Sequence, residues 1–314
     1  MSTTSSTVAP SARRTSLVAV VGDILVDLLV SPGMAPQAGS DTESDISWRQ
    51  GGAAALTAAW LSRLGVPTRF VGRVGDDAGG RFLVQQLESV GLDVRVRVDG
   101  AAPTGTVVAL LTSGRHPLAA PDRDMFTSRG ASGNLAPTDL TSGWLTGIRH
   151  LHLSGYTLLH DGSRAAGLAA LDQAVTAGIS ISVDPASTAP LTEVGPQAFL
   201  SWLPPGTLLT PNDEEATLLT GMSDPARAAM ALAAVAGEAA VTCGADGVVW
   251  SDGSRLITES AAAVTIAASA LNPLGAGDAF TAGLLAARIQ GLPIQLQLRR
   301  GVEAAARLVT GGRA

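Results

Sequence analysis

The sequence predicts an α/β fold in which helices pack against a mostly parallel central sheet. Short apolar runs alternate with alanine-rich helical segments along most of the 314 residues. The first run, Leu17 to Val21, is rich in β-branched residues and ends at Gly22-Asp23, which is typical of a buried parallel strand. Aromatic residues make up only 4% of the chain, whereas Gly, Ala, Val and Leu are abundant. This composition suits closely packed helices on a parallel sheet rather than an aromatic-rich β-sandwich.

The amino-terminal half continues this alternation. The alanine-rich segment 53–64 is expected to form a helix, because Gly65 and Pro67 follow it and neither continues a helix. A strand over 68–71 and a helix over 79–90 come next.

The pattern changes between residues 94 and 127. Val94, Val96 and Val98 alternate with charged residues, and a strand over 105–111 follows without an intervening helix. Such alternation predicts a half-exposed antiparallel sheet.

The strand-helix alternation resumes at residue 148, without an internal repeat. We expect one folded unit over 17–312, preceded by a Ser- and Thr-rich disordered tail over 1–16. The elements predicted for this half are strands over 148–153, 179–183, 207–210 and 239–243, and helices over 163–177, 213–219, 278–289 and 298–309.

The charge of the chain excludes several classes of partner and site. The net charge is −6 and the pI about 5.2, and the Arg residues are scattered, so the chain has no electrostatic footprint for nucleic acid. All 21 Lys plus Arg residues are Arg. A catalytic Lys is therefore excluded, and so is a Walker-type phosphate loop, which requires Gly-Lys.

Cysteine, histidine and hydropathy patterns are typical of a cytoplasmic protein. The single Cys243 cannot form an intramolecular disulfide, and no Cys/His spacing suits structural zinc. His150 and His152 alternate on a predicted strand and so share one face, which alone does not make a metal site. The apolar run 17–30 is short and interrupted by two Asp residues, so we expect neither a membrane span nor export.

The segment Gly275-Ala-Gly-Asp278 carries the strongest local signal for chemistry. The nearly bare backbone of Gly275, Ala276 and Gly277 can aim its N–H groups at one point at a helix start, where the helix dipole favours an anion such as a phosphate. Asp278 would repel that anion, unless it serves to take a proton from an attacking hydroxyl. The alternative is an ordinary loop in which Asp278 caps the helix.

A second signal lies in the segment 210–221. It places Asn212 and Glu215 three positions apart, and so on one face of a helix start. Oxygen ligands of this kind suit a magnesium ion, which keeps several waters and binds through few carboxylates. The same two residues also fit a capping box, and both interpretations can hold together.

With these two segments and a third over 241–250, the chain resembles the PfkB, or ribokinase-like, family of carbohydrate kinases. The resemblance covers nearly the whole chain. It implies a three-layer α/β sandwich with a mostly parallel central sheet and a small β lid, its strands drawn from about 31–50 and 94–127. Because the lid is often a dimer contact in the family, we expect a homodimer formed through it. The motifs that carry the resemblance are Val21-Gly-Asp-Ile-Leu-Val-Asp27, Gly51-Gly52, Val71 to Gly80, Thr210 to Gly221, Val241 to Trp250 and Gly275 to Asp278.

The resemblance also implies roles for the motif residues. Phosphoryl transfer depends mostly on positioning, on neutralisation of charge and on a base that orients the attacking hydroxyl. ATP and Mg²⁺ are the implied cofactors. The implied roles are Asp278 as general base, Gly275, Ala276 and Gly277 as anion hole, Asn212 and Glu215 as organisers of the magnesium water shell, and Thr242, Gly244 and Gly247 as the nucleotide loop.

The same resemblance places the acceptor site in the amino-terminal half. Asp27 and the Gly51-Gly52 backbone would hydrogen-bond sugar hydroxyls, with Asp23 beside them. Two further candidates come from the residues themselves: Trp48 could stack on a sugar or base, and Arg129, where the lid rejoins the core, could reach a phosphate. Each has a structural alternative: a turn or cap for Asp23 and Asp27, packing for Trp48 and a solvated side chain for Arg129.

Four positions depart from the family pattern. Asn272 and Pro273 stand where most members have Asp and Thr, and that Asp arranges a monovalent cation site in ribokinases, so potassium activation is in doubt for this chain. Leu56 replaces the usual Asn, and Leu25 replaces a polar residue common in ribose-specific members. The loss of two hydrogen-bonding groups argues against ribose as the acceptor.

The sequence therefore predicts an ATP-dependent kinase that phosphorylates a hydroxymethyl group of a sugar or sugar derivative. A nucleoside kinase of the same family, including one for pseudouridine-like acceptors, is the alternative, since Leu25 and Leu56 could border a base. A non-catalytic ligand-binding protein on the same fold is a third hypothesis.

Overall fold

The computed structural model describes residues 18–35, 39–112, 122–262 and 274–311. Its main body is built on a nine-stranded sheet with the strand order β13-β12-β11-β10-β9-β8-β1-β4-β5. In this spatial order, the seven strands β11, β10, β9, β8, β1, β4 and β5 are parallel to one another. Strands β12 and β13 add an antiparallel hairpin at the β11 edge. The predicted α/β fold with a mostly parallel sheet is thereby confirmed. The strands are β1 (Val18–Val21), β4 (Thr68–Gly75), β5 (Asp93–Asp99), β8 (His150–Ser154), β9 (Ser180–Asp184), β10 (Thr207–Leu209), β11 (Gly237–Thr242), β12 (Val248–Ser251) and β13 (Leu256–Glu259).

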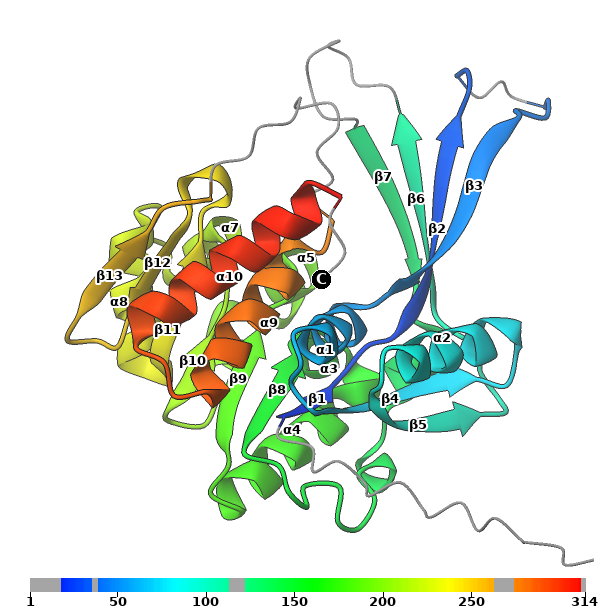
Figure 1. Cartoon of the computed structure of the whole chain (residues 1–314). Helices are drawn as coiled ribbons and strands as arrows, with labels where there is room; N and C mark the ends of the chain where they lie inside the picture. Colours follow the sequence, from blue (N-terminus) through cyan, green and yellow to red (C-terminus); the bar gives the residue numbers. More distant parts are fainter. Residues whose placement is uncertain (1–17, 36–38, 113–121, 263–273, 312–314) are drawn as a thin grey trace, which may run out of the picture.

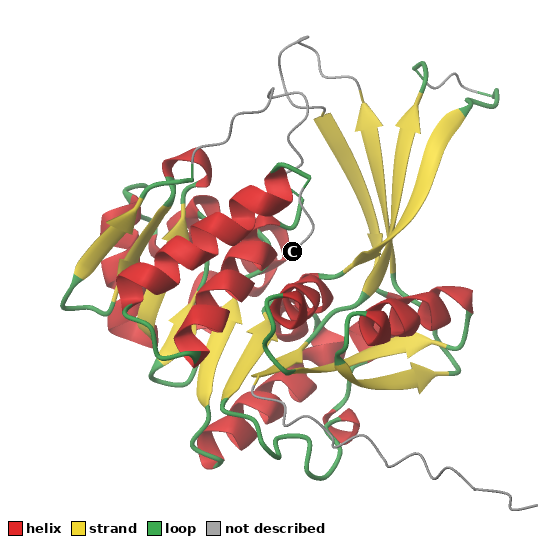
Figure 2. Cartoon of the chain, in the orientation of Figure 1, coloured by secondary structure: helices red, strands yellow, loops and turns green. Residues whose placement is uncertain are grey.

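Helices cover both faces of this sheet (Figures 1 and 2). Helices α1, α2, α9 and α10 pack on one face and α3 to α8 on the other, and each face has its own apolar core. No helix in the described part of the chain is long and apolar enough to cross a membrane. The helices are α1 (Ala53–Arg63), α2 (Ala78–Ser89), α3 (Tyr156–Leu159), α4 (Asp161–Thr176), α5 (Thr188–Val194), α6 (Pro196–Ser201), α7 (Asp213–Thr220), α8 (Pro225–Ala236), α9 (Ala276–Ile289) and α10 (Ile294–Val309).

Local signals in the sequence explain where the principal helices begin and end. Helix α1 ends before Gly65, whose φ of +82° favours glycine. Helix α7 ends at Gly221, in the left-handed conformation common at helix ends. Helix α9 starts at Ala276, two residues earlier than predicted, because Gly275 at a φ of +84° turns the chain into the helix. The predicted tail over 1–16 lies outside the described residues.

A second, four-stranded sheet stands apart from the main body, with the order β3-β2-β6-β7 (Figure 1). We call it the lid sheet. Strands β2 and β6 are parallel, and the two outer pairs are antiparallel. Its strands are β2 (Leu25–Pro32), β3 (Ser44–Gly51), β6 (Thr106–Thr112) and β7 (Asp122–Ser128).

Two predictions about the lid were wrong. The segment 94–98 belongs to β5, which pairs in parallel with β4 at the edge of the large sheet. An edge strand is covered incompletely, so its Val residues alternate with charged ones as they would in a half-exposed antiparallel strand. The lid also begins at Leu25 rather than near residue 31, because β2 takes up most of the apolar run that follows β1.

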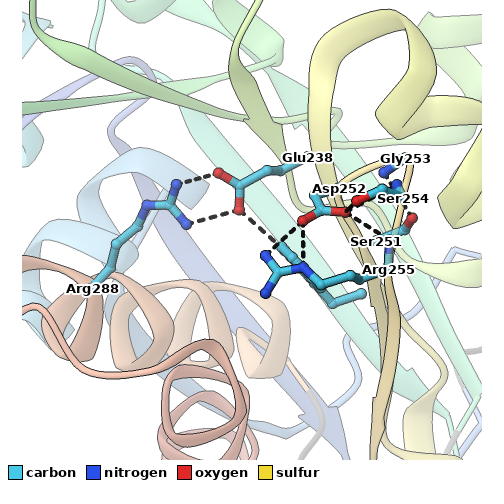
Figure 3. Close-up of polar contacts among 8 residues, drawn as sticks. Glu238, Ser251, Asp252, Gly253, Ser254, Arg255 and Arg288 are labelled. Carbon is cyan, nitrogen blue, oxygen red and sulfur yellow. Dashed lines mark hydrogen bonds and ion pairs between the residues drawn. The ribbon is translucent and has the colours of Figure 1, made fainter.

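The far end of α9 is anchored to the large sheet (Figure 3). The Arg288 guanidinium pairs with both carboxylate oxygens of Glu238 in β11, with 3.0 Å between Nη1 and Oε2. The indole N–H of Trp250 donates to the same Glu238 Oε2 at 3.2 Å, and the Arg255 guanidinium lies 5.2 Å from the Trp250 ring centre. These contacts fix the helix whose other end carries Asp278.

Candidate active site

Most of the predicted site residues gather in a cleft of about 320 Å³ at the carboxyl ends of the parallel strands. The strand order reverses at β1, with β4 on one side and β8 on the other, and ligands of open α/β sheets bind at such a point. The cleft is lined by Asp23, Leu25, Asp27, Gly52, Ala53, Leu56, Val107, Met125, Thr127, Arg129, Tyr156, Asp184, Ala186, Thr210, Asn212, Glu215, Thr242, Leu274, Gly275, Ala276, Gly277 and Asp278.

The amino-terminal end of α9 opens onto this cleft. The N–H of Ala279 donates to Gly275 O at 3.0 Å, so the N–H groups of residues 276–278 precede the hydrogen-bonded part of the helix. Apart from its chain neighbours and the backbone of its own helix, no described residue places an atom within 4 Å of the position that a Cβ would take on Gly277. Within the described part of the chain, the helix end therefore offers backbone donors without a partner beside open space, as an anion hole requires.

Asp278 stands in the first turn of α9 and does not cap it. Among the described residues, its carboxylate has one hydrogen-bond partner, the Thr57 hydroxyl, at 3.3 Å. Burial raises the pKa of Asp278 well above its usual value, and the negative charges of Asp184 and Asp23 add to this effect. A buried carboxylate with a raised pKa is a stronger base than an exposed one.

Asn212 and Glu215 form a capping box at the start of α7. The Glu215 N–H donates to Asn212 Oδ1 at 2.8 Å, and the Asn212 N–H donates to Glu215 Oε2 at 3.0 Å. Both residues also line the cleft. Burial, followed by the charge of Asp184, raises the pKa of the Glu215 carboxyl. Among the described residues only Oε2 of Glu215 accepts a hydrogen bond, so the carboxylate can cap the helix and also present Oε1 to the cleft.

The predicted nucleotide loop is split between the cleft and the protein interior. Thr242 lines the cleft, and its N–H donates to Pro211 O at 2.9 Å, next to the capping box. Gly244 opens an exposed turn. Gly247 is buried at a φ of +99°, and a Cβ there would collide with the backbone of residues 259–261. Gly247 therefore shapes the β11–β12 turn without lining the cleft.

Asp23 and the glycine pair organise the acceptor side of the cleft. The Asp23 carboxylate accepts from Ala53 N at 3.0 Å and from Ala54 N at 3.3 Å, so Asp23 caps α1 while it lines the cleft. At Gly52 the φ is +92°, and a Cβ would lie 2.5 Å from Asp23 O. A Cβ at Gly51 would overlap the Asp27 carboxylate, so this residue must be Gly for Asp27 to hold its place.

Asp27 itself lies half-buried on β2. Burial and the nearby Asp23 charge raise its pKa to about 6, against a lowering influence of Arg49. Among the described residues no hydrogen bond occupies its carboxylate, which is free to accept hydroxyl donors in the cleft.

Arg129 lines the cleft and is partly buried there, with its side chain 22% exposed. Its guanidinium stacks on the Tyr156 ring, 3.6 Å from the centroid, and its Nη1 lies 3.7 Å from Asp23 Oδ2. Nη1 is buried and makes no hydrogen bond with any described residue. Arg129 therefore presents a positive charge beside the acceptor carboxylates.

Trp48 lies away from the cleft. Residues paired across a sheet share one face, and the face of Asp27, Val107 and Thr127 lines the cleft. Trp48 pairs with Leu28 on the opposite face, is 55% exposed and meets the Phe82 ring edge-on at 6.2 Å. Strand alternation thus favours the packing interpretation of Trp48.

The departures at Leu25 and Leu56 both fall in the cleft, where they stand with Val107 and Met125. They give the acceptor side an apolar wall. Asn272 and Pro273 lie outside the described residues.

The two histidines on β8 belong to a buried hydrogen-bonded ladder. Ser182 Oγ lies 2.8 Å from His150 Nε2 and 2.9 Å from His152 Nδ1, and Ser180 Oγ lies 2.8 Å from His150 Nδ1. Burial lowers the pKa of His150 to about 3 and that of His152 to about 4. No group of three or more His, Cys, Asp or Glu side chains in the described ranges could hold a metal ion.

Sequence reasoning missed Asp184 and the turn after it. Asp184 ends β9, lines the cleft, and has its pKa raised by burial. Its Oδ1 accepts from Ala186 N at 2.8 Å, and Ala186, at a φ of +78°, is the one non-glycine residue with positive φ in the described ranges. A signal was available, since ligands of open α/β sheets bind at the carboxyl ends of the strands and Asp184 directly follows the predicted strand 179–183.

Most of the chain matches known kinases. A family model described as "pfkB family carbohydrate kinase" matches residues 15–314. This chain is a pfkB family carbohydrate kinase. Among curated relatives, a fructokinase from Klebsiella pneumoniae is 31% identical over 296 residues, covering 88% of this chain and 86% of its own length. A 2-dehydro-3-deoxygluconokinase from Thermoproteus tenax is 30% identical over 257 residues, covering 79% of this chain and 75% of its own.

Solved structures agree with this assignment. A putative ribokinase II from E. coli, in complex with ATP and Mg²⁺, superposes with a TM-score of 0.78 at 26% identity, covering 94% of this chain and 93% of its own. Family membership makes this protein a phosphotransferase with an alcohol acceptor, in the class of the sugar kinases.

Proposed function

We propose that this pfkB family kinase transfers the γ-phosphoryl group of ATP to a hydroxymethyl group of a sugar or sugar derivative. The observation that carries the proposal is the position of Asp278 beside the open amino-terminal end of α9. The acceptor hydroxyl would lie between Asp278 and the free N–H groups of residues 276–278. Asp278 would take its proton as the oxygen attacks phosphorus, while those N–H groups stabilise the charge on the transferring group.

The residues around the cleft fit ATP and magnesium. Asp184 and Glu215 are acids with raised pKa values: after burial, the charge of Asp184 raises the pKa of Glu215 and the charge of Asp23 raises that of Asp184. No salt bridge joins either acid to a basic side chain among the described residues. A divalent cation would relieve that repulsion. In the proposal, Glu215 and Asn212 hold Mg²⁺ through water, and Thr242 and Gly244 contact the nucleotide. Magnesium would supply neutralisation of phosphate charge.

The acceptor side supports a sugar with one apolar region. Asp27, the Gly52 backbone and Asp23 offer acceptors and donors for hydroxyls, and Arg129 offers a positive charge. Leu25 and Leu56 form part of the opposing apolar wall. A fully hydroxylated ribose would leave hydroxyls unpaired there, which a binding site penalises strongly.

The apolar wall also favours a second candidate, a nucleoside kinase of the same family. A base bordered by Leu25, Leu56, Val107 and Met125 would bury apolar surface, and the ribose hydroxymethyl group would be the acceptor. A protein that only binds ligands on this fold is disfavoured by the Asp278 carboxylate at the helix end, because among the described residues only its Oδ1 is hydrogen-bonded.

The test is magnesium-dependent ADP release with pentoses, hexoses, sugar acids and nucleosides, with the Asp278→Asn variant in parallel. We expect one acceptor class to raise turnover far above the acceptor-free rate in the parent protein, and the variant to lose at least about a thousandfold in kcat with ATP binding retained. Turnover that requires a nucleoside would replace the sugar assignment. Full activity of the Asp278→Asn variant would refute the assignment of the base.

A further inference from the structure

The Thr57 hydroxyl donates to a side chain of another helix rather than to the backbone of its own helix. Two other helical threonines, Thr192 and Thr220, each donate their hydroxyl to the carbonyl four residues earlier at 2.7 Å, and Thr310, which caps the end of α10, does so at 3.0 Å. Such a bond is the ordinary solution for a threonine inside a helix. Thr57 in α1 instead donates to Asp278 Oδ1 in α9, at 3.3 Å. We propose that Thr57 is a positioning residue, which orients the carboxylate of the base. This inference rests on the proposed role of Asp278.

The position of Thr57 is fixed from the acceptor side of the cleft. The Asp23 carboxylate accepts from the first N–H groups of α1, and the Ala55 N–H donates to Asp23 O at 3.2 Å. Helix α1 then packs its buried face into the core shared with α9. Thr57 is 1% exposed, so water does not compete for its hydroxyl. Asp23, α1 and Thr57 therefore form a rigid connection from the acceptor site to Asp278.

The hydrogen bond also distinguishes the two oxygens of Asp278. Oδ1 is occupied by Thr57, whereas Oδ2 lies on the side of the glycine turn, 3.7 Å from the position of a Cβ on Gly275. Oδ2 is thus the oxygen left free next to the expected phosphoryl site. Holding Oδ1 restrains the rotation of the carboxylate, and a base that is already oriented reacts faster than one that must be fixed during the reaction.

Thr57 also opposes the acidic surroundings of Asp278. The charged groups facing it are Asp184 at the end of β9, Asp23 after β1 and Asp27 in β2. All three are acids and, after burial, raise the pKa of Asp278, whereas the donated hydroxyl of Thr57 lowers it. The hydroxyl therefore helps to keep Asp278 in the ionised form that accepts a proton.

The test compares Thr57→Val, Thr57→Ser and Thr281→Val with the parent enzyme, using the acceptor that the panel identifies. Thr281 is the matched control, because its hydroxyl is buried one turn further along α9 and has no partner among the described residues. For Thr57→Val we expect kcat to fall about tenfold, with the acceptor KM changed less than about twofold. The acid limb of kcat/KM should move up by about one pH unit. Thr57→Ser and Thr281→Val should stay close to the parent.

The outcomes separate this inference from the proposed function. An unchanged kcat and pH profile in Thr57→Val would overturn it, and so would an equal loss in Thr57→Ser, which would indicate packing. If Thr57→Val does not fold, Thr57→Ala is measured by the same readouts. An active Asp278→Asn enzyme would refute the proposed function, in which Asp278 is the general base. If Asp278→Asn is inactive while Thr57→Val keeps the kcat and pH profile of the parent, only the positioning role of Thr57 is refuted.

Discussion

At the residue scale, Glu215 combines a structural and a proposed chemical role in one carboxylate. One oxygen completes the capping box of α7, and the group lies next to Asp184 in the cleft. Ala186 shows a similar combination, because its left-handed backbone lets its N–H bond the Asp184 carboxylate. Ala186 adopts an unfavourable backbone conformation and Glu215 buries a carboxyl group, and local costs of this kind are common at functional sites.

Replacing Glu215 by Gln separates its two roles. Gln still offers an oxygen to the Asn212 N–H, so the cap survives and the melting temperature should change little. Without the charge, the magnesium concentration for half-maximal activity should rise about tenfold. Asp213→Asn, an exposed acid in the same turn, is the control and should not change the magnesium titration. An identical titration for Glu215→Gln would refute its assignment to the metal.

Replacing Ala186 by Gly should stabilise the protein. The left-handed conformation costs an alanine about 1–2 kcal/mol, and a glycine adds roughly 0.4–1 kcal/mol of unfolded-state entropy, so a net gain of about 0.5 kcal/mol is expected. Ala234→Gly, on the exposed side of α8, is the control and should lose about 0.5–1 kcal/mol. Urea unfolding of both variants checks the opposite signs. A loss in Ala186→Gly would show that its backbone is not strained.

At the element scale, β8 carries a polar ladder through the centre of the sheet. The imidazoles of His150 and His152 are buried between β8 and β9 and satisfied by Ser180 and Ser182. Burying neutral histidines is tolerated because each ring finds hydroxyl partners, whereas a charged ring would lose its hydration. The ladder therefore makes the stability of the strand pair depend on pH.

The pH dependence has a definite sign. Burial lowers the pKa of His152 from 6.5 to about 4, so between these values the unfolded chain binds a proton that the folded chain refuses. The contribution of His152 to stability is complete above about pH 6.5 and is lost as the pH falls towards 4. In that range His152→Leu should remove about 1.4 kcal/mol per pH unit from the slope of unfolding free energy against pH. Urea unfolding at pH 7, 6 and 5 gives the slopes. Parallel slopes would contradict a buried neutral His152.

At the scale of the whole molecule, the lid sheet has two different faces. One faces the cleft with Asp27 and Val107. The other face carries a row of apolar residues that crosses all four strands of the lid sheet and includes large, exposed side chains. This row consists of Trp48, Leu28, Val108 and Phe126, with Ile46 and Val30 beside it, and Trp48, Phe126 and Ile46 are 55%, 62% and 62% exposed.

We expect this outer face to be buried in a homodimer formed through the lid, as the resemblance implied. Exposed apolar surface that extends over several strands is typical of a contact site. Ile46→Asp and Phe126→Asp should each shift the protein towards monomer, by placing charges in a contact that excludes water. Met230→Asp, on the exposed side of α8, is the control and should leave the mass unchanged. Sedimentation velocity gives the mass, and a monomeric parent would refute the prediction.

Many features of this protein are encoded in contiguous residues and were determined by the sequence itself. Helix α1 ends where Gly65 and Pro67 end it, the capping box follows from Asn212 and Glu215, and Gly275 to Asp278 marks the turn into α9. Backbone propensities, caps and turns act over a few positions, so a single sequence displays them.

Only the tertiary structure decided which distant residues meet. It brought Thr57 to Asp278 across 221 positions, placed Asp184 in the cleft and turned Trp48 away from it. It also placed the strand 93–99 at the edge of the large sheet. Pairing, facing and edge position depend on strand partners far along the chain, and local alternation is the same for an edge strand and for a half-exposed sheet. The chemistry was therefore visible in motifs, whereas its positioning was set by the fold.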